Sequence, residues 1–62
     1  MAKEIFKKAQ EAIMAEVTLQ DCYRRMSQDT ANPKVKAVLH DLLLMEEMNE
    51  VLLRSLNGSL DA

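Results

Sequence analysis

The chain has 62 residues, of which 48% are hydrophobic, and a net charge of −2. This length allows one small domain and too little core for comfortable stability alone, so a partner or a metal is expected. The weakly acidic balance, with no basic or aromatic face sustained along the chain, argues against a nucleic-acid-binding protein.

No apolar run approaches the roughly 20 residues of a membrane span, and no signal peptide is visible at the N-terminus. The single cysteine, Cys22, excludes a disulfide within the chain and fits a reducing compartment. We therefore expect a cytoplasmic protein with neither nucleic acid nor membrane as a partner.

The first predicted element is a helix over about residues 3–29, a stretch without Gly or Pro. A turn follows at about 30–32, where Asn32 is a good N-cap and Pro33 suits the first helical position. The second helix should run over about 33–57, with Gly58 as its C-cap. The fold class is all-α, because two long helices joined by so short a turn fold back as one antiparallel hairpin over residues 1–62.

One carboxylate interrupts the apolar stripe of each predicted helix. Glu16 lies among residues such as Ala9, Ile13 and Tyr23, and Glu46 among leucines of the second helix. A turn centred near residue 31 places Glu16 and Glu46 at the same height. A carboxylate in such a stripe is costly to bury unless it is paired, protonated or bound to metal.

The second predicted helix is apolar on nearly all sides. Its outer face, opposite Glu46, carries Ala37, Leu44, Met48 and Val51. A helix of this kind is buried on more than one side. We expect a homodimer of hairpins that forms a four-helix bundle, and a higher homo-oligomer through the outer face of the second helix.

These residues resemble the ferritin-like superfamily, in particular rubrerythrin-type half-bundles and two-helix encapsulated ferritins. Those families carry a Glu on the first helix, often a Tyr seven residues later, a turn frequently beginning Asn-Pro, and then Leu-x-x-Leu-Ala-x-x-Glu-x-x-His. The corresponding residues here are Glu16, Tyr23, Asn32-Pro33 and Leu39-x-x-Leu42-Leu43-x-x-Glu46-x-x-Asn49. The chain departs from the pattern at Asn49, which stands where the family has its histidine ligand.

The resemblance implies a di-iron site shared by two hairpins, with Glu16 and Glu46 as metal ligands and Tyr23 as a hydrogen-bond donor behind them. Asn49 and Glu50 would be further ligands, which moves the site toward oxygen-only ligation. A ferroxidase-type oxidation of ferrous iron would be weakened by Asn49, because an amide oxygen is a poorer iron ligand than imidazole. Manganese, or no metal, remains the alternative to iron.

Two other interpretations stay open. The tail Asn57-Gly58-Ser59-Leu60 resembles the Gly-Ser-Leu element of encapsulin cargo peptides, which implies an encapsulin shell as a partner. Alternatively, the protein is a metal-free structural or adaptor homo-oligomer, in which Glu16 and Glu46 only fix the register of the bundle.

Overall fold

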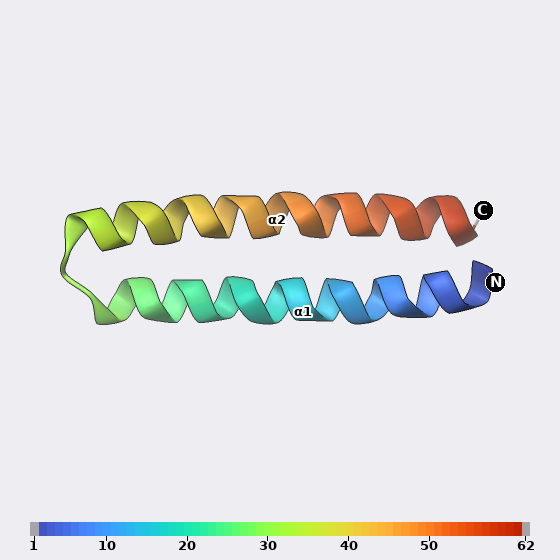
Figure 1. Cartoon of the computed structure of the whole chain (residues 1–62), viewed down its shortest axis with the longest axis horizontal. Helices are drawn as coiled ribbons and strands as arrows, with labels where there is room; N and C mark the ends of the chain where they lie inside the picture. Colours follow the sequence, from blue (N-terminus) through green and yellow to red (C-terminus); the bar gives the residue numbers. More distant parts are fainter. Residues whose placement is uncertain (1, 62) are drawn as a thin grey trace.

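The computed structural model describes residues 2–61, which form two long helices (Figure 1). Helix α1 spans Ala2–Asp29 and helix α2 spans Pro33–Asp61. They run antiparallel and side by side, so the start of α1 and the end of α2 lie together, far from the turn (Figure 1). The predicted all-α hairpin is confirmed.

The turn is closed by polar groups that the Asn-Pro sequence supplies. The Oδ1 atom of Asn32 accepts hydrogen bonds from the backbone N–H groups of Lys34, at 2.9 Å, and Val35, at 3.3 Å. Asn32 is therefore the N-cap of α2, as predicted, and Pro33 occupies the first helical position, where no N–H is needed. The hydroxyl of Thr30 accepts a further hydrogen bond from the N–H of Asn32, at 3.2 Å.

The predicted end of the second helix is wrong. Helix α2 continues past Asn57 and through Gly58 to Asp61, and Gly58 does not have a positive φ. One glycine inside a helix costs only about 1 kcal/mol relative to Ala. Leu60 is half-buried, and this burial favours continuing the helix. The Gly58-Ser59-Leu60 tripeptide is thus helical.

The two helices share a thin core. Ala9, Ile13 and Leu39 are the buried apolar residues, and no side chain among those described is fully buried. The hairpin measures 46 × 14 × 12 Å and its radius of gyration is 14.3 Å, against about 10.6 Å for a compact domain of this length. A single layer of two helices therefore leaves large apolar side chains on its surface.

Neither of the two helices, over the residues described, is long and apolar enough to cross a membrane.

Candidate functional site

The middle of the helix–helix contact is polar. Gln20 is only 6% exposed and its amide Nε2 donates a hydrogen bond of 2.7 Å to the Oε1 atom of Glu50. The same Nε2 lies 3.5 Å from the backbone carbonyl oxygen of Glu46. This link between the helices was not identified from the sequence.

Glu50 is held within the hairpin from both sides. While Gln20 binds Oε1, the Nε atom of Arg54 lies 2.8 Å from Oε2. The Gln20 hydrogen bond, followed by that of Arg54, holds the pKa of the Glu50 carboxyl below its ordinary value. Glu50 was predicted as a further metal ligand, but both of its oxygens already have partners in the single chain.

This arrangement predicts how stability depends on pH. Because the pKa of Glu50 is lowered by folding, its contribution is complete above the ordinary value of 4.5 and is lost as pH falls through the lower folded-state pKa. The Gln20→Leu variant removes the largest cause, so its free energy of unfolding should fall less steeply between about pH 5 and about pH 3. Urea denaturation at a series of pH values measures this, with Gln28→Leu as the matched control. Equal slopes for the two variants would contradict the assignment.

Glu16 has a different environment. Its side chain is half-buried, and its Oε2 atom is buried without a hydrogen-bond partner. It lines an open groove of about 410 Å³ between the helices together with Ala12, Asn49, Leu52, Leu53 and Leu56. A buried carboxylate oxygen without a partner is unfavourable. The single hairpin therefore leaves this Glu16 oxygen without a hydrogen-bond partner.

Glu16 and Glu46 do not lie at the same height along the hairpin, which differs from the expectation based on a turn centred near residue 31. Asn49 is exposed and lines the groove beside Glu16, whereas half-buried Glu46 lies one turn nearer the loop, at the level of Gln20. The offset follows from the tilt of side chains toward the N-terminus of their own helix, which is opposite in direction for antiparallel helices. Tyr23 lines a separate pocket near the turn with Leu39.

No group of three His, Cys, Asp or Glu side chains able to hold a metal ion occurs among the described side chains, those of residues 2–60. Glu16 and Glu46 supply one carboxylate each. A metal site built on them needs oxygen ligands from outside this hairpin, because a divalent ion held by protein oxygens takes about six or more ligands.

Two rows of apolar residues, most of them exposed, extend from the groove toward the turn. Ala12 of α1 and Leu52 of α2 line the groove. Ala12 begins a row of three residues on α1 and Leu52 ends a row of three on α2. The residues of each row are seven positions apart, which keeps them on one side of their helix. We call these residues the apolar face: Ala12, Leu19 and Met26 on α1, and Val38, Met45 and Leu52 on α2.

The apolar face is open to solvent in the hairpin. Leu19 is 38% exposed and Met45 62% exposed. The α2 row was not identified from the sequence, although its spacing of seven residues was the available signal. Exposed apolar surface this continuous is typical of an interaction site.

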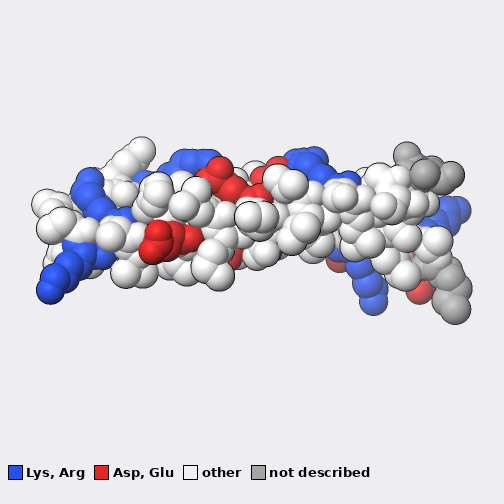
Figure 2. Space-filling view, turned by 90° about the horizontal axis from the view of Figure 1, so that it is seen from above, with Lys and Arg blue, Asp and Glu red and all other residues white. Residues whose placement is uncertain are grey.

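The outer face of α2 is also weakly charged. Figure 2 looks onto α2 from outside, and uncharged side chains cover most of this view, while Lys, Arg, Asp and Glu gather mainly at the ends and toward the two long edges. Leu44, Met48 and Val51 are each more than half exposed there, as expected for a helix that is apolar on nearly all sides.

Comparisons of this chain with family models, with curated proteins and with solved structures found no match.

Proposed function

We propose that the protein is a ferritin-like, metal-binding homodimer in which two hairpins pack through their apolar faces into a four-helix bundle. The observation that carries the proposal is the buried, unpartnered Oε2 atom of Glu16 in the groove of that face. A second copy closing the groove brings a second Glu16 carboxylate and a second Asn49 amide to it, and adds its own Glu46 one turn nearer the loop. A bound metal ion then satisfies oxygens that otherwise lie buried without partners.

The exposed area supports pairing. A compact monomer of 7.1 kDa exposes about 4,100 Å², whereas this hairpin exposes 4906 Å². The excess is about 800 Å², which is the area that one partner contributes to a standard protein interface. A symmetric dimer uses the same face on both copies, so one apolar face is sufficient.

The ligands of this site are oxygen atoms. Glu16 and Glu46 of each copy are the primary ligands and Asn49 is an additional one, while Glu50 becomes available only if its bonds to Gln20 and Arg54 break. Carboxylate and amide oxygens suit manganese as well as iron. With iron bound, the chemistry that the site would supply is oxidation of ferrous to ferric ion, with dioxygen or peroxide as the electron acceptor, in an iron-handling role. The exposed thiol of Cys22 supports a reducing compartment, the cytoplasm.

Anaerobic loading with ferrous iron, followed by desalting and elemental analysis, tests the proposal. The wild-type protein should retain iron, and Glu16→Ala should retain close to none. Glu11→Ala is the matched control, since Glu11 lies on the same helix and is exposed, and it should retain as much as the wild type. Equal iron in all three proteins, or none in the wild type, would exclude this function.

A metal-free structural homo-oligomer is the second candidate. It is favoured by the hydrogen bonds of Glu50 to Gln20 and Arg54, which satisfy a carboxylate without any metal, and by Asn49 in place of the expected histidine. Buried polar residues in a bundle fix its register and oligomeric state. In this function the outer face of α2 is the surface that joins one dimer to the next.

A further inference from the structure

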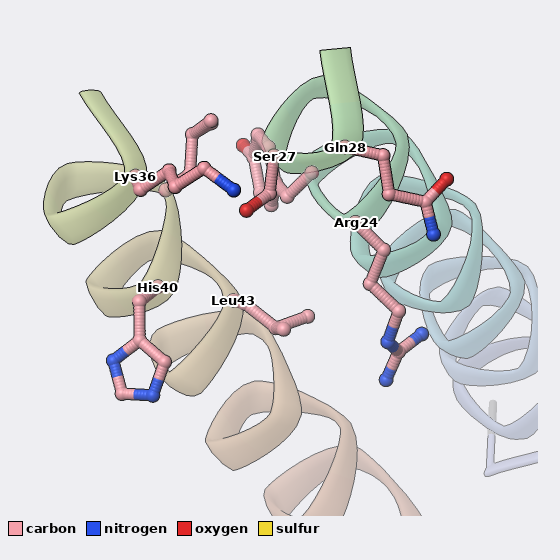
Figure 3. A pocket seen from close by; sticks show the side chains of 8 residues that line it. Arg24, Ser27, Gln28, Lys36, His40 and Leu43 are labelled. Atoms are coloured by element: carbon pink, nitrogen blue, oxygen red, sulfur yellow. The ribbon is translucent and has the colours of Figure 1, made fainter. Parts of the chain in front are cut away.

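A second pocket lies near the turn, on the edge of the hairpin opposite the apolar face. Arg24 and Met26 are two residues apart on α1, as are Lys36 and Val38 on α2, and two residues correspond to about 200° around a helix. The pocket has a volume of about 310 Å³, and its position on the opposite edge would leave it open in the proposed dimer. Figure 3 shows Lys36 and Leu43 extending from α2 toward α1. The residues that line the pocket are Tyr23, Arg24, Ser27, Gln28, Lys36, Leu39, His40 and Leu43.

Basic groups from both helices border this pocket, although the chain as a whole is acidic. Among the side chains of residues 2–60, no carboxylate oxygen lies within 4.0 Å of the charged nitrogens of Arg24 or Lys36. His40 has only the exposed Asp41 beside it, at 3.8 Å. Arg24 also attracts the Glu50 carboxylate and makes a small contribution to lowering its pKa, smaller than those of Gln20 and Arg54. The positive charges of Arg24 and Lys36 therefore border the pocket without a carboxylate within ion-pair distance.

The floor of the pocket is apolar. Leu39 is 4% exposed, and Tyr23 and Leu43 are half-buried beside it. Ser27 and Gln28 add neutral hydrogen-bond donors at the rim. A pocket of this size, with an apolar floor and a few polar groups converging on it, is typical of small-ligand sites.

We propose that this pocket binds a small phosphate monoester with an apolar or aromatic body. The phosphate, a dianion with three oxygens, matches the donors of Arg24, Lys36 and His40, which approach from two helices. The body of the ligand packs on Tyr23 and Leu39. A nucleic-acid strand fits less well, because the basic groups do not continue as a stripe along either helix.

Phenyl phosphate is the probe, and the chain offers clean reporters for it. Tyr23 is the only tyrosine and His40 the only histidine, and both line the pocket. Titration followed by proton NMR should shift both sets of ring signals with one common dissociation constant. Inorganic phosphate lacks the apolar body and benzyl alcohol lacks the charge, so each should bind at least about fivefold more weakly.

Lys36→Gln should weaken phenyl phosphate binding by about tenfold, which is the loss of one charge-assisted hydrogen bond. Lys34→Gln removes the same charge two residues away but outside the pocket, and should change the affinity less than twofold. Equal losses in the two variants, or equal binding of phenyl phosphate and benzyl alcohol, would overturn the proposal. Preferred binding of an RNA oligonucleotide over phenyl phosphate would overturn it as well. The pocket contains neither Glu16 nor Glu46, so the result is independent of metal binding.

Discussion

Replacing Leu52 with Lys should convert the proposed dimer into a monomer of low stability. Leu52 is 60% exposed in the single hairpin and lines the groove beside Glu16, so a second copy would bury it. A lysine there loses the apolar contact and buries a charge, at a cost of about 3 kcal/mol. The dimer dissociation constant should rise more than about a hundredfold, as measured by sedimentation equilibrium.

Val51→Lys is the control for this experiment. Val51 is the neighbouring residue and is 64% exposed, but it lies on the outer face of α2 and does not line the groove. This variant should remain a dimer and lose only association between dimers. A dimer that survives Leu52→Lys, or one that Val51→Lys disrupts equally, would show that the apolar face is not the interface.

Replacing Glu16 with Gln should have opposite effects on stability with and without metal. In the metal-free protein, glutamine removes a charge from a site where one oxygen is buried without a partner. The expected gain is about 1 kcal/mol, which raises the melting temperature by roughly 4–8 °C for a domain of this size.

Added metal should reverse the order of the two proteins. The wild type should gain about 2.7 kcal/mol at a metal concentration of a hundred times the dissociation constant, whereas Glu16→Gln should gain nothing. Thermal unfolding at one fixed protein concentration measures both effects, and Glu47→Gln, which alters an exposed carboxylate, should behave as the wild type. A Glu16→Gln protein that metal stabilises as strongly as the wild type would exclude Glu16 as a ligand.

The hairpin could be predicted because its signals are local. An unbroken stretch before Asp29 and the Asn32-Pro33 pair define the first helix, the turn and the cap of the second helix, and each depends on residues adjacent in sequence. The end of α2 was missed because Gly58 is also a local signal, but here the helix continues and half-buried Leu60 lies beyond the glycine. Where local preference is worth only about 1 kcal/mol, packing decides.

The candidate site was predicted in part. Glu16 and Glu46 were identified as misplaced carboxylates, and both are half-buried. The hydrogen bonds of Glu50 to Gln20 and Arg54 were not predicted, although Glu50 and Arg54 are four residues apart on one helix, a spacing that favours an ion pair. The contact between Glu50 and Gln20 depends on which residues of the two helices lie at the same height. Side chains tilt toward the N-terminus of their own helix, and this tilt changes the residues that meet, which counting residues from the turn does not take into account.

The central claim is that two copies pair around the Glu16 carboxylates and hold metal between them. Native mass spectrometry after loading with manganous ion measures chain number and bound metal in the same particle. The account predicts two chains carrying two manganese ions, and loss of the metal from the Glu16→Gln protein. A wild-type dimer that stays free of metal at saturating manganese, or manganese held by a single chain, would contradict it.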